Sequence, residues 1–176
     1  MLKLLPPSTY HLPPTRRGQI LVESILALGV LTMGFLGAFT LLSRSFILNR
    51  AVADEYVATY LAAEGVEVVK NIIDHNQILR VTSEPARAWD AGISDGAYEI
   101  QYDSTTLAVN QNRTLKFDPS TKLYSYSGPN NTTFRRTLNI TKATDEIIVK
   151  SQVDWTGHGG SSRQTILEDH FYRWRP

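Results

Sequence analysis

Hydrophobic residues follow two different patterns in the first part of the chain. Residues 20–42 are apolar apart from a few small polar side chains and one charge, Glu23. At about 1.5 Å per residue, a helix over this run is about 35 Å long, which is enough to cross a bilayer. Over residues 54–75 the apolar side chains recur at steps of three and four, and charged residues fill other positions. This spacing predicts an amphipathic helix.

No strong helix breaker separates these two patterns. Proline is absent between Gly18 and Pro85, so we predict one continuous helix from about residue 20 to about residue 75. Residues 76–96 contain Pro85, Gly92 and the pair Asp95-Gly96, which predict a loop. The helix face expected to be buried in the second half carries Ala58, Ala62, Val66, Val69 and Ile73.

After residue 96 the period changes to two, which is typical of strands. Turn-forming residues separate the alternating segments, and together they predict an antiparallel meander. One face of this sheet needs an apolar cover, and the second half of the helix is the only long amphipathic element. The predicted fold class is therefore α+β, with a long N-terminal helix packed by an antiparallel sheet. The alternation places Phe134, Arg136, Leu138 and Ile140 on one face of their strand, and Ile147, Val149, Val153 and Trp155 on one face of the next.

Glu23 requires an explanation, because an ionised carboxylate in hydrocarbon is costly. A secretory signal should end in a small-residue cleavage site, but residues 37–45 lack one and the apolar run is too long. A twin-arginine signal, suggested by Arg16 and Arg17, requires the same cleavage site. A simple single-pass anchor with Glu23 at a membrane interface remains open.

A third interpretation takes the leader and the helix as one unit. Residues 1–18 hold four prolines, three basic residues and no acid, and they end in Arg-Arg-Gly. Four residues then separate Gly18 from Glu23 and the apolar helix. This pattern resembles the prepilin leader of type IV pilins and pseudopilins. The run "LVESILALGVLTMGFLGAF" resembles the helices of V-type minor pilins and I-type pseudopilins, and the resemblance covers about the first 75 residues.

The resemblance implies that a prepilin peptidase cuts after Gly18 and N-methylates the new first residue, Gln19. It also implies other pilin subunits, the pilus assembly platform and the membrane as partners. A free α-amino group has a pKa near 8 and is largely protonated at neutral pH. In a bundle of such helices, the Glu23 carboxylate of one subunit can meet the amine of a neighbour. This pairing offsets desolvation and fixes the axial register of the subunits.

Several features differ from major pilins. Gln19 replaces the usual phenylalanine or methionine, no cysteine is present, and no proline interrupts the helix near Gly34. These differences favour a minor pilin or pseudopilin. Gly34 and Ala38 form a small-xxx-small pair that allows helices to pack closely. Alternatively, the glycines of this segment only lower helix propensity.

Composition and charge give no sign of a catalytic or metal site. The absence of cysteine excludes disulfides and thiolate chemistry, and the four histidines do not have the spacing of metal ligands. Glu168, Asp169 and His170 lie near the last strand without a nucleophile motif, so we interpret them as a solvated strand end. We expect no enzyme activity, no cofactor, no metal and no small-molecule substrate.

The C-terminal residues 171–175, "FYRWR", mix aromatic and basic side chains, as in some proteins that bind single-stranded nucleic acid. Strand alternation also explains them, because the aromatic residues Tyr172 and Trp174 then share one face. The chain has 18 basic and 17 acidic residues, and removing the leader with its three basic residues leaves 15 against 17. We therefore do not expect nucleic acid as a partner.

The sequence thus predicts five segments: a prepilin leader (1–18), a transmembrane or filament-core helix (19–43), an amphipathic continuation (44–75), a loop (76–96) and an antiparallel β domain (97–176). The predicted function is a structural subunit of a type IV pilus or a type II secretion-like filament. It is inserted in the cytoplasmic membrane with its N-terminus in the cytoplasm and then forms part of a filament at the cell surface. The alternative is a single-pass anchored, extracytoplasmic binding module that does not polymerise.

Overall fold

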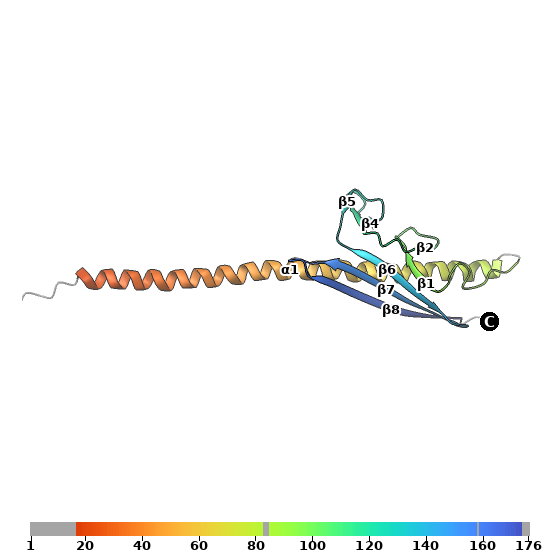
Figure 1. Cartoon of the computed structure of the whole chain (residues 1–176), viewed down its shortest axis with the longest axis horizontal. Helices are drawn as coiled ribbons and strands as arrows, with labels where there is room; N and C mark the ends of the chain where they lie inside the picture. Colours follow the sequence, from red (N-terminus) through yellow and green to blue (C-terminus); the bar gives the residue numbers. More distant parts are fainter. Residues whose placement is uncertain (1–16, 83–84, 158, 174–176) are drawn as a thin grey trace, which may run out of the picture. The chain divides into compact units, whose positions relative to one another are not determined.

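The computed structural model describes residues 17–82, 85–157 and 159–173, of Arg17 the backbone only. The chain divides into two compact units, Met1–Phe46 and Ile47–Pro176, which are described separately. The fold is α+β, as predicted: a long N-terminal helix is followed by antiparallel strands (Figure 1). The elements are α1 (Arg17–Thr82), β1 (Gly96–Glu99), β2 (Ala108–Val109), β3 (Lys116–Asp118), β4 (Leu123–Ser125), β5 (Asn130–Asn131), β6 (Arg135–Lys142), β7 (Glu146–Thr156) and β8 (Ser162–Tyr172).

Helix α1 continues to Thr82, beyond the end near residue 75 that the sequence predicted. Residues 76–82 contain neither glycine nor proline, so nothing in them stops the helix. The Asn76 side chain is buried here and donates hydrogen bonds from Nδ2 to the carbonyl oxygens of Trp89, at 3.3 Å, and Ala91, at 2.8 Å. These bonds hold the segment after the helix against its last turns.

The strands form two sheets, so the prediction of a single meander was wrong. The larger sheet has the order β2-β1-β6-β7-β8, and its neighbouring strands are antiparallel. Strands β6, β7 and β8 form a meander. On its side away from β7, β6 pairs with β1, and Tyr98 of β1 lies opposite Leu138 of β6. Residues between β2 and β6 form a separate small sheet with the order β4-β3-β5. In the large sheet, β8 forms one edge and the two-residue β2 forms the other.

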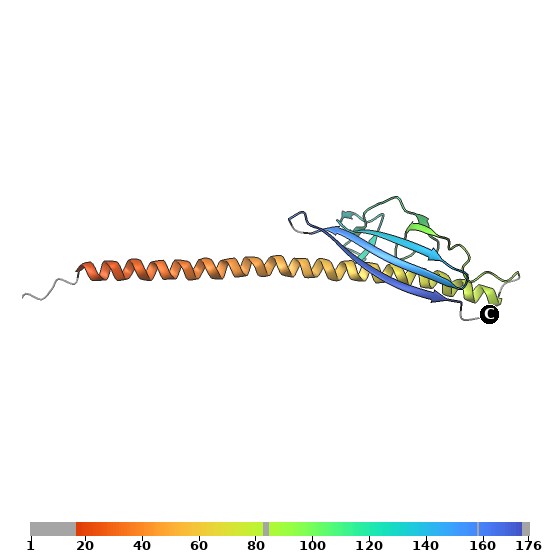
Figure 2. The same cartoon turned by 60° about the horizontal axis from the view of Figure 1, so that its bottom comes forward.

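The large sheet packs along the part of α1 that belongs to the second unit (Figure 2). Both predicted buried faces are confirmed, since none of the helix or strand positions named above is more than 7% exposed. One core cluster includes Val69, Trp89 and Leu138, and the other includes Ala62 and Trp155. Apolar burial of this kind is the main force that stabilises the unit.

One charged residue lies within this apolar interface. Arg136 is fully buried, on the face of β6 that it shares with Leu138 and Ile140. Its Nη1 donates to the carbonyl oxygen of Leu61, at 2.8 Å, and to Oε1 of Glu64, at 2.9 Å. Its Nη2 donates to the carbonyl oxygen of Ile100 at 2.6 Å. A buried charge is tolerated only with such partners, and here they join α1, β6 and the residue after β1.

Gly65 allows α1 to come this close to the sheet. A Cβ atom at this position would lie 2.4 Å from Oγ of Ser151, 3.1 Å from Cδ of Arg136 and 3.2 Å from Cδ2 of Leu138. Real Cβ atoms essentially never make the first of these contacts. A side chain larger than hydrogen would therefore push the helix and the sheet apart. This close contact of Gly65 with the sheet was not predicted from the sequence.

We expect Gly65→Ala to lower the free energy of unfolding of the second unit by about 1–2 kcal/mol. Overpacking a core costs about 1–3 kcal/mol, and the better helix propensity of alanine returns at most about 1 kcal/mol. Urea unfolding of the full chain in detergent micelles, followed by tryptophan fluorescence, measures the difference.

Two further variants control this experiment. Gly34→Ala adds the same methyl group where nothing lies within 4 Å, so it should not destabilise the unit. Ser151→Ala in the Gly65→Ala background should recover most of the loss, because it removes the nearest obstacle, a buried hydroxyl without a hydrogen-bond partner in the described part of the chain. An unchanged or higher stability of Gly65→Ala would contradict the close approach.

Candidate functional site

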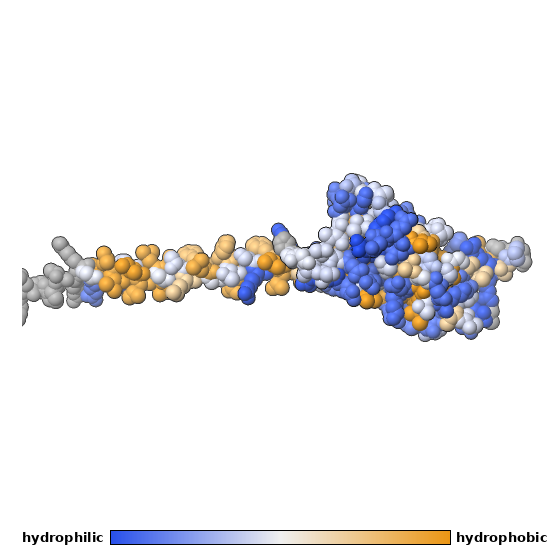
Figure 3. Space-filling model, in the orientation of Figure 1, coloured by the Kyte–Doolittle hydropathy of each residue, from blue (hydrophilic) through white to orange (hydrophobic). Residues whose placement is uncertain are grey.

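The first unit presents an apolar surface without any cover. Every residue from 18 to 46 is helical and exposed, and the large apolar side chains range from 55% exposed at Leu31 to 76% at Met33. Figure 3 shows the hydrophobic colouring of this segment. Exposed apolar patches of this extent mark contacts with a membrane or another protein. Among the described residues, α1 is the one helix that is long and apolar enough to cross a bilayer.

The residues of the predicted cleavage site lie at the beginning of this helix. The helix starts at Arg17, so the bond between Gly18 and Gln19 lies in its first turn. Amide groups in the first turn of a helix have no partners within the helix. Opening the chain for a peptidase therefore breaks few hydrogen bonds at this position. The remainder of the predicted leader, residues 1–16, lies outside the described residues.

Glu23 lies one turn after Gln19 on the same stripe of the helix. A shallow groove follows this stripe, and each helical turn contributes two neighbouring residues to its lining. These residues are Gly18, Gln19, Val22, Glu23, Leu26, Ala27, Val30 and Leu31. No hydrogen bond or ion pair engages the Glu23 carboxylate within residues 17–82, 85–157 and 159–173. Any strong partner of this carboxylate thus has to come from outside the described chain.

The other polar side chains of the apolar run differ from Glu23. The hydroxyl of Ser24 donates to the carbonyl oxygen of Ile20 at 2.8 Å. Thr32 donates to Gly29 at 2.9 Å, and Thr40 donates to Leu36 at 2.8 Å, in the same manner. Each of these hydroxyls is satisfied by its own helix, as a polar group in hydrocarbon must be. Residues 20–42 thus carry one polar side chain without an internal partner, and it is the charged one.

Gly34 and Ala38 lie on one stripe with Leu31 and Phe35, around a second shallow groove. A Cβ atom on Gly34 would meet nothing within 4 Å. The groove is thus open to a neighbouring helix, which agrees with the small-xxx-small interpretation. The alternative role of the glycines in lowering helix propensity predicts the same open surface, so both interpretations remain.

The acidic and basic residues of the last strand form a cluster on the outer face of β7 and β8. Nδ1 of His170 lies 2.6 Å from Oε1 of Glu146, and its Nε2 lies 3.1 Å from Oε1 of Glu168. Glu168 also pairs with Lys150 at 3.1 Å. The hydrogen bond to Glu146, and then that to Glu168, raises the pKa of His170. All these residues are at least partly exposed, which agrees with a solvated strand end.

Two other kinds of site considered from the sequence were a metal site and a nucleic-acid contact at the basic tail, neither of which was expected. Within the described ranges, no three His, Asp or Glu side chains are arranged to hold a metal ion. Arg173, one of the basic residues of the tail, forms an ion pair with Asp145 at 3.2 Å. Trp174 and Arg175, together with His158, lie outside the described residues.

No family model matches the sequence, and no similar protein was found among curated proteins or solved structures. The functional interpretation therefore depends on the leader motif, the helix and the sheet. A long apolar N-terminal helix followed by an antiparallel sheet is compatible with a pilin-like protein and with a membrane-anchored protein.

We expect Glu146→Gln to lower the pKa of His170 towards its ordinary value. Since the carboxylates raise the pKa in the folded state, the cluster stabilises the β7–β8 pairing below the unfolded pKa of about 6.5. This contribution is lost as the pH rises through the higher folded value. The chemical shift of the His170 ring protons against pH, measured by NMR, gives the pKa. Asp169→Asn removes the same charge from the opposite face of β8 and should have the smaller effect; equal effects would argue against the direct contact.

Proposed function

We propose that this protein is a minor pilin or pseudopilin, a structural subunit of a type IV pilus or a type II secretion-like filament, and not an enzyme. The observation that carries the proposal is the carboxylate of Glu23, which has no partner among the described residues and lies in the apolar run 20–42, where every hydroxyl is satisfied by the helix itself. Such a group is expensive in a bilayer or a filament core unless a second molecule supplies a positive charge.

Cleavage after Gly18 would create this charge at the right place. The new amine of Gln19 lies about 6 Å along the helix axis from Glu23, because the two residues are separated by one turn. Within one subunit the two groups would share a stripe. Between two parallel helices, an amine–carboxylate contact requires an axial offset of about one turn. The pair would thus select one register from the many that an apolar surface alone permits.

The remaining steps follow from the same assignment. The subunit is inserted in the cytoplasmic membrane with its N-terminus in the cytoplasm, where the prepilin peptidase cuts it and N-methylates Gln19. The assembly platform then moves the helix from lipid into the filament, where neighbouring subunits cover the same apolar surface. The open groove at Gly34 and Ala38 supports this proposal, because it gives room for a close neighbour.

The second candidate is a single-pass anchored module that never polymerises. The exposed apolar helix favours it as much as it favours the pilin. In this case Glu23, two turns from the beginning of the helix, would lie at the membrane interface with water and lipid headgroups around it. The two candidates differ in the mature N-terminus.

We expect the membrane-associated protein to begin at Gln19, with or without one added methyl group. Mass spectrometry of the protein from cells with and without the prepilin peptidase tests this expectation, and the cut should disappear without the enzyme. An uncut Met1, or a cut beyond Leu42, would favour the anchored module.

We also expect Glu23→Ala to reduce incorporation into filaments by about tenfold or more, the equivalent of about 1.4 kcal/mol in binding. Membrane insertion should remain normal, because the substitution makes the helix more apolar. The measurement is the ratio of subunit in sheared filaments to subunit in membranes. Glu67→Ala, which removes an exposed acid from the second unit, is the matched control and should assemble normally. Normal incorporation of Glu23→Ala would disprove the register mechanism.

A further inference from the structure

The second unit contains a polar pocket that has no part in the proposed assembly mechanism. The pocket has a volume of about 410 Å³ and lies between α1, the segment after it and the turn after β1. It is lined by Asn71, Ile72, His75, Arg87, Ser104 and Thr105. Small-molecule sites typically have volumes in this range.

The lining of the pocket supplies hydrogen-bond donors and one fixed positive charge. Arg87 contributes the guanidinium, Asn71 an amide, His75 an imidazole, and Ser104 and Thr105 contribute hydroxyls. No acidic residue lines the pocket, and the nearly buried Ile72 gives it an apolar surface. These groups complement a ligand that is negatively charged and rich in acceptors.

Four of these residues have no partner for their side chains among the described residues. In the part of the chain that the structure describes, no hydrogen bond or ion pair engages Asn71, His75, Arg87 or Thr105. Of the two acids nearest to Arg87 in sequence, Asp90 pairs with Lys142 at 2.5 Å, and Glu84 lies outside the described residues. The acids next to His75 and Ser104 also have other partners. Asp74 pairs with Lys70 at 3.4 Å, and Asp103 accepts a hydrogen bond from Gln101 at 2.7 Å. Among the described residues, the charge of Arg87 is therefore available to a ligand.

Ser104 connects this pocket to a second one. Its hydroxyl accepts a hydrogen bond from the backbone N–H of Gln101 at 2.9 Å, which fixes its position. It also lines a neighbouring pocket of about 360 Å³ that contains Arg113 and Tyr126. The Arg113 guanidinium lies 4.3 Å from the centre of the Tyr126 ring and is held by the buried Glu99. The two pockets therefore share the Ser104 hydroxyl in their lining.

We infer that the pocket at Arg87 binds a sugar that carries a carboxylate, such as a uronic acid within a surface glycan. The planar guanidinium matches a carboxylate in two parallel hydrogen bonds. One fixed positive charge matches a single carboxylate better than a doubly charged phosphate. The amide and the hydroxyls match the ring hydroxyls of a sugar, and Ile72 matches its C–H face. This inference goes beyond the structural role and does not depend on filament assembly.

Titration of the full chain in detergent micelles with D-glucuronate tests the inference. NMR spectra of the backbone amides should show saturable shifts at Ile72 and Thr105. Glucose has the ring without the carboxylate, and acetate has the carboxylate without the ring, so both should bind at least about tenfold more weakly. Inorganic phosphate should also bind more weakly. No saturable shift with glucuronate, or equal or tighter binding of any of the three comparison ligands, would overturn the assignment.

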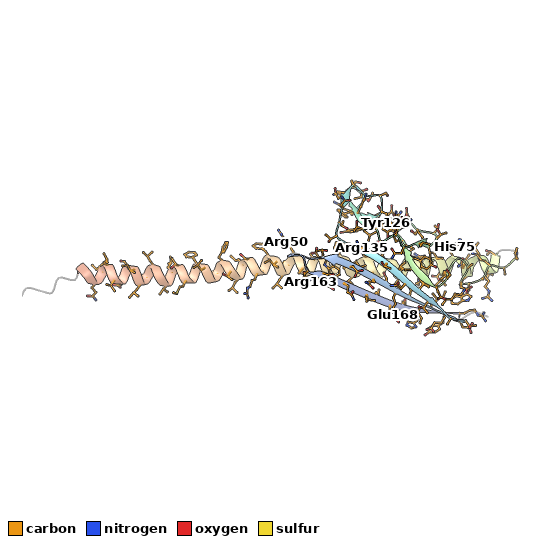
Figure 4. All side chains as sticks on the ribbon, viewed as in Figure 1. Arg50, His75, Tyr126, Arg135, Arg163 and Glu168 are labelled. Atoms are coloured by element: carbon orange, nitrogen blue, oxygen red, sulfur yellow. The ribbon has the colours of Figure 1, made fainter. Side chains whose placement is uncertain are left out.

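Two arginine variants separate the pocket from general charge effects. Arg87→Gln should weaken glucuronate binding by about tenfold or more while the rest of the spectrum stays unchanged, since Arg87 is exposed and holds no other element. Arg163→Gln removes an exposed arginine of β8 that lies away from His75, towards the other end of the sheet, and should bind glucuronate normally (Figure 4). Unchanged binding by Arg87→Gln, or equal losses in both variants, would overturn the site.

Discussion

The burial of Arg136 between α1 and the sheet is the interaction on which the second unit depends. Apolar contacts on either side of it could slide along the helix at little cost, because they are not directional. A guanidinium with three defined acceptors cannot slide along the helix in this way. Removing any acceptor would leave a buried charge without full compensation. Gly65 makes this geometry possible by letting the sheet approach the helix backbone. The position of the sheet along α1 follows from this contact.

The two units differ in where their charged and apolar groups find partners. In the second unit, a charged group is buried within the chain and finds all its principal partners there. In the first unit, an entire apolar surface and one carboxylate have no partner within the described residues. The first unit therefore exposes groups that water alone does not stabilise well. Such an exposed surface is expected of a subunit of a larger assembly or of a membrane anchor. In the proposed assembly, the amine of a neighbour's Gln19 neutralises the charge of Glu23. Lipid or other helices cover the apolar surface.

Periodicity predicted the parts of the fold that alternate regularly. The faces of α1, β6 and β7 were correct, including the face that Arg136 shares with Leu138, because a residue's face follows directly from its place in the repeat. That a charged residue on this face is fully buried was not predicted. Strand pairing was not predictable in the same way, since β1 joins β6 across many intervening residues and competes with nearer segments. The role of Gly65 and the pocket at Arg87 depend on contacts between distant segments, which no local pattern encodes. The motif at Gly18 and Glu23 was visible in the sequence because it is local.

The long edge strand β8 has a consequence for the proposed subunit before it assembles into a filament. Its eleven residues present a free edge, which in many proteins invites another chain to add a strand. Under the proposed function, subunits held in a membrane would be crowded and oriented alike, so such pairing would trap them in the wrong contacts. Charged side chains project from both faces of β8, among them Arg163, Glu168 and Asp169. They make the edge a poor template for aggregation, so that copies of the proposed subunit would stay separate in the membrane before they enter a filament.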